Sequence, residues 1–436
     1  MSIPKASSPK SSRGKLVLLL AGLFVLVLTG CASNAPLDTL DPAGSKAEDI
    51  DNFFRPIFWL ATVVFVLIQG TVIFLWWRFR VPKAAAGEDS FPGGYADEEF
   101  PEQVHGIFKL EIAWTVIPAI ILLVIGIFSV SLLLELDDVE ASDSVYTDME
   151  IVVVGQQWWW EYQYHMDGDT TTPPDFVTAN EIVIPIDEEV RIYTTSRDVI
   201  HSFWIPRLNG KKDSVPGRVH PWVLQSNEVG RFAGQCTEFC GLSHAYMRMY
   251  AVALSESDFG DWVVNQQADR TLLVEGDENF EGQEVFLNNC QRCHVVMGVT
   301  ERDRDGDGED ELDNAAMYGE LEQYRDLTDG TLSQGKHLED GNLTSGAAPN
   351  LTHFATRSSY AGSYFELYAD AEDLIAAGGY NDLPGSGHFR SVLEAWLRNA
   401  PGEKPNATPE QSRGMPNLNL EEQDIDLLAD YLLSLD

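Results

Sequence analysis

Sulfur and imidazole side chains cluster at one point in the second half of the chain. Cys236, Cys240, His244 and Met247 fall within 12 residues, and His201 precedes them by 35 positions. Soft sulfur combined with imidazole selects copper or zinc over hard cations. The Met247 thioether favours copper, because structural zinc sites use thiolate, imidazole and carboxylate ligands. A disulfide between the two cysteines and a zinc site of two cysteines and two histidines are the alternatives, and neither explains the methionine.

A second motif predicts a covalent haem. The segment Cys290-Gln291-Arg292-Cys293-His294 has the C-x-x-C-H spacing, in which both thiols bond to the porphyrin and the histidine binds the iron. A redox-active cysteine pair is the alternative for an isolated match. The sixth iron ligand must come from elsewhere, and Met415 suits this role because a thioether raises the haem potential. The competing ligands are Met317, His337, His353 and His388.

The chain is strongly acidic. Its 29 Lys and Arg against 68 Asp and Glu give a net charge of −39. This balance excludes non-specific nucleic-acid binding and calls for a basic partner, with a high-salt habitat as the alternative explanation. In an acidic insertion at about 299–345, Asp303–Gly308 matches the first half of a calcium loop, but its twelfth position is Asn314 instead of the bidentate Glu. We therefore favour a solvated insertion over a calcium site.

The N-terminus predicts an exported lipoprotein. An uncharged run from Leu16 to Leu28 follows several basic residues, is too short to span a bilayer and is typical of a secretory signal. It ends in Leu28-Thr29-Gly30-Cys31, which resembles the bacterial lipobox. We expect residues 1–30 to be removed and Cys31 to be lipidated. The alternative is an ordinary signal peptide followed by a free or buried cysteine.

Two longer apolar runs predict a transmembrane hairpin. Ile57–Trp77 and Ile112–Leu134 carry no charge except at their flanks, and each is long enough to cross about 30 Å of hydrocarbon as a helix. Arginine and lysine directly after the first run place the connecting loop in the cytoplasm. Everything after the second run is therefore expected on the extracytoplasmic side of a bacterial cell membrane.

Residues 145–265 are predicted to form a β domain. Short runs of β-branched and aromatic residues, broken by turn residues, indicate a sandwich or a Greek-key barrel. These runs are Ile151–Val154, Ile182–Pro185, Val190–Thr194, Trp222–Leu224 and Met249–Leu254. Residues Pro173–Asn180 are expected to be a hairpin tip or loop.

Several segments together resemble the dinuclear copper (CuA) domain of cytochrome c oxidase subunit II, which has a cupredoxin-like Greek-key fold. They are the Cys236–Met247 loop, Asp198–Phe203, Pro216–Arg218 and Gly155–Trp160, while Glu111–Pro118 resembles the second-helix signature of that family. The resemblance implies two bridging thiolates, one histidine for each copper and two weak ligands. These are Cys236, Cys240, His201, His244, Met247 and the main-chain carbonyl of Glu238.

The same resemblance implies roles for three further groups. The Glu238 carboxylate would face subunit I and help to hold a magnesium or manganese ion. Trp158 would be an exposed side chain through which electrons arrive, with ordinary packing as the alternative for adjacent tryptophans. Glu111 would lie at the mouth of a proton path into subunit I, with a snorkelling surface carboxylate as the alternative.

The C-terminal part resembles a class I cytochrome c, an all-α domain. Beyond the haem motif, Ala348–Leu351 and Trp396 match that family's pattern, with Pro349 near the proximal imidazole. An amphipathic helix from Glu421 to Leu435 is expected to pack across the first helix of this domain.

The whole chain therefore resembles subunit II of a haem–copper cytochrome c oxidase with a fused cytochrome c, the caa3 type. The expected order is a signal peptide (1–30), an N-terminal segment (31–50), a transmembrane hairpin (51–140), a copper domain (145–265), a linker (266–279) and a tethered haem domain (280–436). Electrons would pass from a cytochrome c or a quinol–cytochrome c reductase through both centres to subunit I, where oxygen is reduced to water with proton translocation. Subunits I and III would be its partners. A subunit of a copper-containing nitric oxide reductase and a stand-alone membrane redox carrier are the alternatives.

Overall fold

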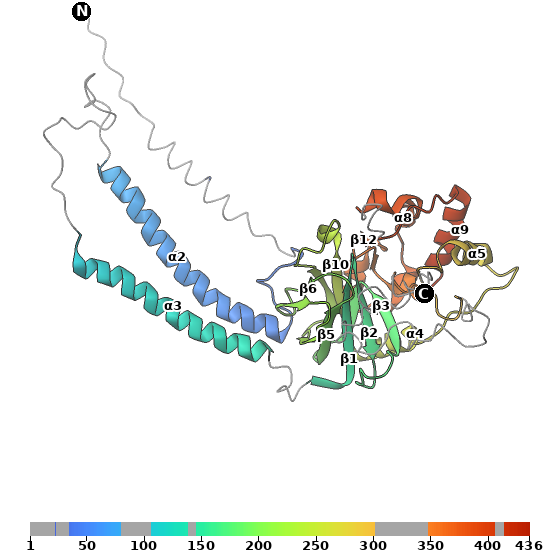
Figure 1. The fold of residues 1–436 in the computed structure, drawn as a ribbon, viewed down its shortest axis with the longest axis horizontal. Helices are drawn as coiled ribbons and strands as arrows, with labels where there is room; N and C mark the ends of the chain where they lie inside the picture. Colours follow the sequence, from blue (N-terminus) through green and yellow to red (C-terminus); the bar gives the residue numbers. More distant parts are fainter. Residues whose placement is uncertain (1–21, 23–34, 80–105, 138–144, 301–347, 406–413) are drawn as a thin grey trace, which may run out of the picture.

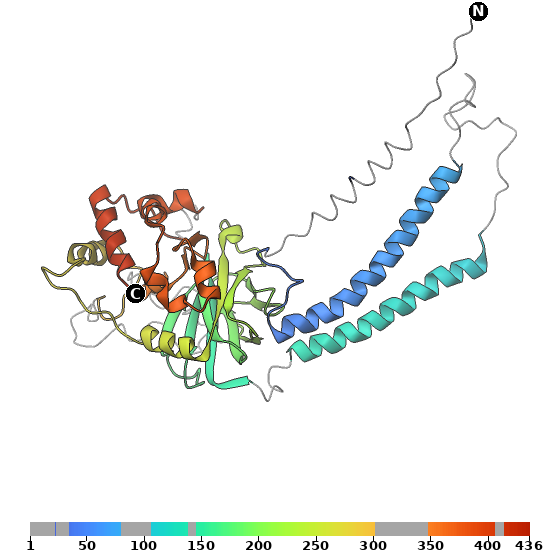
Figure 2. The ribbon, with the colours of Figure 1, turned by 180° about the vertical axis from the view of Figure 1, so that it is seen from behind.

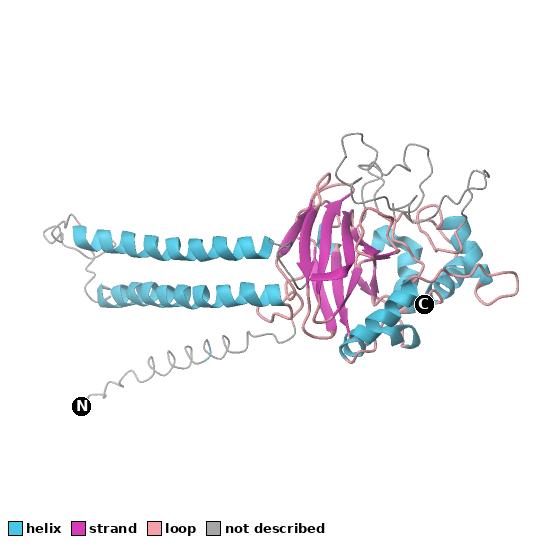
Figure 3. Cartoon of the chain, turned by 90° about the horizontal axis from the view of Figure 1, so that it is seen from below, coloured by secondary structure: helices cyan, strands magenta, loops and turns pink. Residues whose placement is uncertain are grey.

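Two long helices form the hairpin predicted from the apolar runs. The computed structural model describes residues 22, 35–79, 106–137, 145–300, 348–405 and 414–436. Helices α2 (Ser45–Phe79) and α3 (Phe108–Asp137) are both long and apolar enough to cross a membrane. They lie alongside each other and project from one side of a β unit, while a C-terminal unit lies on its opposite side (Figures 1 and 3).

Helix α2 begins 12 residues before the predicted Ile57 because its first turns contact the β unit and not lipid. Ala47 and Asp51 in these turns are buried. Just before the helix, the Ala43 N–H donates to the Arg207 carbonyl at 2.7 Å. Gly44 lies so close that a Cβ there would stand 2.3 Å from the Gln225 carbonyl oxygen. The β unit therefore fixes the start of the membrane hairpin.

The β unit consists mainly of two sheets, of five and three strands. The larger sheet, in the order β3-β2-β1-β5-β8, contains β1 (Val145–Gln156), β2 (Trp159–His165), β3 (Phe176–Ala179), β5 (Glu189–Ser196) and β8 (His220–Leu224). The smaller sheet, in the order β4-β10-β9, contains β4 (Glu181–Pro185), β9 (Gly230–Gln235) and β10 (Arg248–Leu254), and a separate pair is formed by β6 (His201–Trp204) and β7 (Lys211–Ser214). Every strand predicted from the sequence is present within this set.

One prediction within the β unit is wrong. Residues 173–180 were expected to be a loop, but Phe176–Ala179 form β3, which pairs antiparallel with β2. The two prolines before the strand obscure it in the sequence, because proline marks turns. The Phe176 ring stacks on Tyr164 at 4.6 Å between centroids, and this aromatic contact fixes the strand in the sheet.

The C-terminal unit is largely helical. Its helices are α5 (Phe280–Asn289), α7 (Ala371–Ala376), α8 (Arg390–Glu403) and α9 (Glu422–Leu433). As predicted, the closing helix α9 packs across α5. Gly282 makes this crossing possible, because a Cβ there would lie 2.3 Å from the Leu427 carbonyl oxygen. A short hairpin of β11 (Ser359–Tyr360) and β12 (Phe365–Glu366) departs from the all-α expectation.

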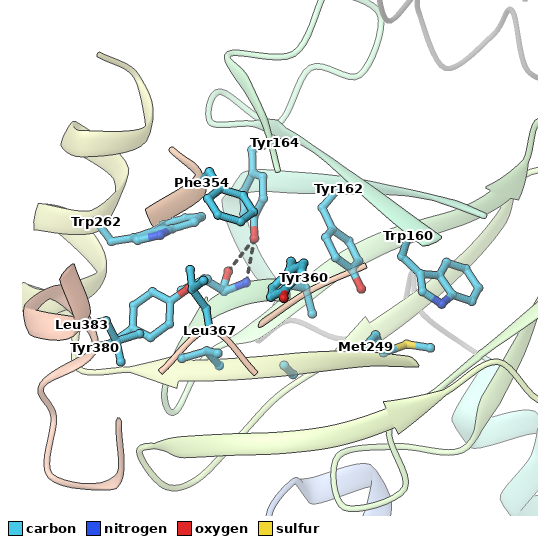
Figure 4. Close-up of a cluster of buried hydrophobic side chains, with 14 of the residues drawn as sticks. Trp160, Tyr162, Tyr164, Met249, Trp262, Phe354, Tyr360, Leu367, Tyr380 and Leu383 are labelled. Carbon is cyan, nitrogen blue, oxygen red and sulfur yellow. Dashed lines mark hydrogen bonds between the residues drawn. The ribbon is translucent and has the colours of Figure 1, made fainter. Parts of the chain in front are cut away.

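A single hydrophobic core joins the β unit to the C-terminal unit (Figure 4). The β unit contributes Trp160, Tyr162, Tyr164, Met249 and, from helix α4 (Glu256–Gln266), Trp262; the C-terminal unit contributes Phe354, Tyr360, Leu367, Tyr380 and Leu383. The two units also lie side by side in opposite views (Figures 1 and 2). The segment expected to be a linker starts at the last residue of α4, and its Leu273 packs against this core. The C-terminal unit is therefore docked on the β unit.

A buried carboxyl group lies at the centre of this interface. Glu181 on β4 is only 2% exposed, and its carboxylate accepts four hydrogen bonds from described residues of the C-terminal unit. The donors are the Ser358 N–H at 2.9 Å, the Ser358 hydroxyl at 2.5 Å, the Ser359 hydroxyl at 2.6 Å and the Tyr380 hydroxyl at 3.0 Å. Buried polar groups need such partners, because an unpaired one costs about 1–3 kcal/mol.

Glu181→Ala should weaken the docking of the C-terminal unit. Its donors lose their acceptor inside the core, so we expect a loss of at least about 3 kcal/mol. Thermal unfolding of the detergent-solubilised chain, followed by tryptophan fluorescence, measures the effect. Glu188→Ala is the control, because Glu188 is exposed in the turn after the same strand. Equal melting temperatures for both variants would contradict this role of Glu181.

Candidate metal centre

The predicted copper ligands come from separate loops and meet at one end of the β unit. His201 opens β6, and the cysteines lie in the loop after β9. His244 opens the short helix η2 (His244–Tyr246), and Met247 follows it. Both thiols, His201 and Met247 are buried, whereas the Glu238 side chain is exposed. The structure therefore brings together all six groups expected from the sequence.

The distances within the cluster suit shared metal ligation. The two thiol sulfurs are 3.8 Å apart. His201 Nδ1 lies 3.9 Å from the Cys236 sulfur, and His244 Nδ1 lies 3.6 Å from the Cys240 sulfur. The Glu238 carbonyl is 3.3 Å from Cys236, and the Met247 sulfur is 3.8 Å from Cys240. Each thiol thus has an imidazole and one weak donor beside it.

The charge state of the thiol pair favours a metal. The hydrogen bond from the Cys240 thiol lowers the pKa of Cys236 to about 4 and raises the pKa of Cys240. The lowered pKa favours the thiolate at Cys236, and the thiolate is the form that ligates metals. Neither cysteine forms a disulfide, so the disulfide alternative is not realised in this structure.

Asp198 orients the imidazole of His201. Its carboxylate lies 2.8 Å from His201 Nε2, which directs Nδ1 toward the thiols. A carboxylate in this position fixes the tautomer and raises the basicity of a histidine ligand. No role for Asp198 is predicted from the sequence, although its i, i+3 spacing from His201 is a usable signal.

Trp158 is not exposed, contrary to the expectation. The residue is 4% exposed, and its main-chain carbonyl is contacted by Lys404 of the C-terminal unit. The indole N–H donates to the Cys240 carbonyl at 3.0 Å, and the Gln157 side chain donates to the same oxygen at 2.6 Å. Trp158 therefore lies directly against the cluster, between it and the C-terminal unit.

The haem motif lies at the end of α5. Cys290 caps this helix, and neither Cys290 nor Cys293 forms a disulfide. His294 Nδ1 lies 2.7 Å from the Pro349 carbonyl, so Nδ1 carries the proton and Nε2 keeps its lone pair. Burial lowers the pKa of His294 and keeps the ring neutral. This is the tautomer that an iron ligand needs.

The proposed sixth ligand, Met415, is half-buried and packs against the hydrophobic core of the C-terminal unit. The competing His353 donates from Nε2 to the Ala268 carbonyl at 3.0 Å. Glu111 lies exposed in the first turn of α3. Cys31, Met317, His337 and the Asp303–Gly308 loop lie outside the described residues.

A cupredoxin-like β unit with a buried thiolate–imidazole cluster, carried on two membrane-length helices, defines a membrane-anchored redox-metal protein. Residues 149–254 match the family model for the periplasmic domain of cytochrome c oxidase subunit II, and residues 32–132 match the model for its transmembrane domain. The chain belongs to the cytochrome c oxidase subunit II family. It is thus a component of a haem–copper terminal oxidase and assembles with subunit I in a membrane. The periplasmic domain of this family binds the CuA centre, and the corresponding His/Cys/Cys cluster is present here.

Curated relatives extend over much of the chain. Cytochrome c oxidase subunit 2 of Alkalihalophilus pseudofirmus is 35% identical over 279 residues, which cover 63% of this chain and 75% of the relative. The subunit of Bacillus subtilis is 30% identical over 368 residues, which cover 79% of this chain and 96% of the relative. The solved periplasmic domain of cytochrome oxidase subunit II of Bradyrhizobium japonicum is 29% identical, covers 28% of this chain and 96% of that domain, and has a TM-score of 0.26.

Asp198→Asn should weaken copper retention by about 10–100-fold, because the amide no longer holds His201 in its ligating tautomer. Copper loss to a chelator, followed by metal analysis of the purified chain, measures the change. Asp213→Asn is the matched control, since Asp213 is exposed on β7. Identical copper loss from the two variants would show that Asp198 does not support the site.

Proposed function

We propose that this oxidase subunit carries two redox centres, a dinuclear copper centre in the β unit and a covalent haem c in the C-terminal unit. The copper assignment rests on the way the ligand atoms converge. Two imidazoles, a thioether and a carbonyl each lie within about 4 Å of one of the two thiol sulfurs, which are themselves 3.8 Å apart. When bound, the two centres supply one-electron chemistry, taking electrons from a donor and delivering them to subunit I, where oxygen is reduced to water with proton translocation.

The donor set fits copper better than zinc. Cys236 and Cys240 would bridge the metals, His201 and His244 would each bind one, and Met247 and the Glu238 carbonyl would be weak ligands. Soft sulfur selects copper, and a thioether has no place in structural zinc sites. The rigid strands on both sides of the loop hold these groups in place, which limits their movement when charge changes.

The C-terminal residues fit a haem c. Cys290 and Cys293 would form the thioether bonds, since neither is in a disulfide, and the His294 tautomer leaves Nε2 for the iron. We assign Met415 as the second residue that would hold the haem iron, because a thioether raises the potential of a haem. The helix crossing of α5 and α9 and the position of Pro349 support the similarity to class I cytochromes c.

The copper loop offers a surface for subunit I. The Glu238 side chain is exposed, and its neighbours Phe239 and Leu242 are 76% and 57% exposed. Exposed apolar side chains beside a metal loop are typical of an interaction surface. We assign the Glu238 carboxylate to a magnesium or manganese ion shared with subunit I, and Glu111 to the mouth of a proton path. Subunit III is a further expected partner.

We place both units on the extracytoplasmic side of a bacterial cell membrane, with Cys31 as a lipid anchor. This topology follows from the basic residues after the first helix and agrees with the requirement of haem c attachment for the exported side. The acidic surface of the chain suits a basic electron donor, such as a cytochrome c, because opposite charges steer association.

Metal analysis, haem spectroscopy and EPR on the purified full chain test this function together. We expect covalently attached haem c and a mixed-valence dinuclear copper signal in the same sample. Met415→Leu should lower the haem potential, whereas Met297→Leu should not, because Met297 lies too near His294 to reach the opposite haem face. Iron without copper, or only mononuclear copper, would contradict the proposal. Oxygen uptake without nitric oxide reduction by the assembled complex would exclude the reductase alternative.

A further inference from the structure

A buried lysine connects the C-terminal unit to the backbone beside the metal cluster. Lys404, which follows α8, is 5% exposed. Its ammonium donates to the Trp158 carbonyl at 2.9 Å and to the Ala361 carbonyl at 2.7 Å. No carboxylate of the described residues lies within ion-pair distance of it. A buried amine held only by two carbonyls is costly to keep charged, and burial lowers the pKa of Lys404 to about 7.

The first of these carbonyls belongs to a segment that is bonded to the cluster. Trp158 donates through its indole to the carbonyl of Cys240. Gln157, the preceding residue, donates its N–H to Asp198 at 2.7 Å, and Asp198 holds His201. Lys404 thus contacts the Gln157–Trp158 segment. This segment is hydrogen-bonded to the main chain of the ligand Cys240 and to Asp198, which holds the ligand His201.

The two units also contact each other on either side of Lys404. The Arg248 N–H donates to the Gly362 carbonyl at 2.9 Å, and Ser243 donates to the Pro405 carbonyl. Gly362 has a φ of +74°, and a Cβ there would lie 2.6 Å from the Lys404 nitrogen and 2.7 Å from the Trp158 carbonyl oxygen. Only glycine permits this approach. The two units therefore touch through main-chain atoms next to the ligand loop.

We propose that Lys404 is a positioning residue for electron transfer within this chain: its ammonium holds the Trp158 segment and the Ala361–Gly362 turn together and so fixes the distance between the C-terminal unit and the copper cluster. The inference rests on the proposed function, since it requires both centres. It also implies that the Trp158 face is closed to a separate donor, which must deliver its electrons to the C-terminal unit.

Lys404→Met tests this proposal in the assembled oxidase, because methionine keeps the aliphatic stem and removes the ammonium. We expect electron transfer from the photoreduced haem to the copper centre to slow by at least about tenfold, as small misplacements carry large kinetic costs. Lys404→Arg should restore much of the rate by keeping a buried donor. Lys211→Met is the control, since Lys211 is an exposed lysine of the β unit beside Trp204.

A second variant separates positioning from a failure to fold. Gly362→Ala retains the lysine in the sequence but puts a Cβ 2.6 Å from its nitrogen and 2.7 Å from the Trp158 carbonyl oxygen. It should therefore displace the lysine contact, separate the two segments and slow transfer in the same way. Gly385→Ala is its control, because a Cβ there meets nothing within 4 Å. In both slow variants, hydrogen exchange at the Arg248 amide should accelerate, while the copper EPR signal and the haem spectrum stay unchanged.

Electron transfer at the wild-type rate in Lys404→Met would overturn the positioning role. Slow transfer that is always accompanied by loss of the copper EPR signal would overturn it too, because the variant would then have damaged the copper centre itself. Wild-type protein that lacks either centre would instead overturn the proposed function, and the inference with it. The hydrogen-exchange measurement needs no bound metal. Unchanged exchange at Arg248 in both variants would therefore show that Lys404 does not hold the interface closed.

Discussion

Tyr380, Ser358 and Ser359 of the C-terminal unit all donate to the Glu181 carboxyl group on a strand of the β unit, and they do so inside a continuous aromatic core. This interaction is polar and directional, whereas the core around it is apolar and non-directional. Together they hold the two units in one orientation. Arg231 adds a second link, because it pairs with Glu366 of β12 at 2.7 Å. A tethered carrier would need none of these contacts.

Docking in one orientation would change how the chain uses the two redox centres that we propose. A mobile domain on a linker gains from high effective concentration, but each transfer then waits for a productive encounter. A docked domain removes that wait and relies on fixed geometry instead. The burial of Trp158 follows from the same arrangement, since the surface that a separate donor would approach is occupied by the chain itself.

The β unit lies between the membrane hairpin and the C-terminal unit (Figures 1 and 3). It anchors the first turns of α2 through Ala43 and Gly44, and it binds the end of α3 through an ion pair between Lys212 and Asp137. This central position suits a subunit that connects an external electron donor to a membrane-embedded partner. Its strands supply the stiffness, while the loops at one end supply the ligands.

The sequence by itself determined the chemistry of the molecule, because ligand type and spacing are local properties. Short segments were enough to predict the metal ligands between Cys236 and Met247, the haem motif from Cys290 to His294 and the two apolar runs. Tertiary structure decided how these parts meet. Strand β3, the burial of Trp158, the contacts of Lys404 and the donors around Glu181 all depend on residues at least 12 positions apart. No periodicity or motif encodes such pairings, because they arise only when separate segments compete for the same buried space.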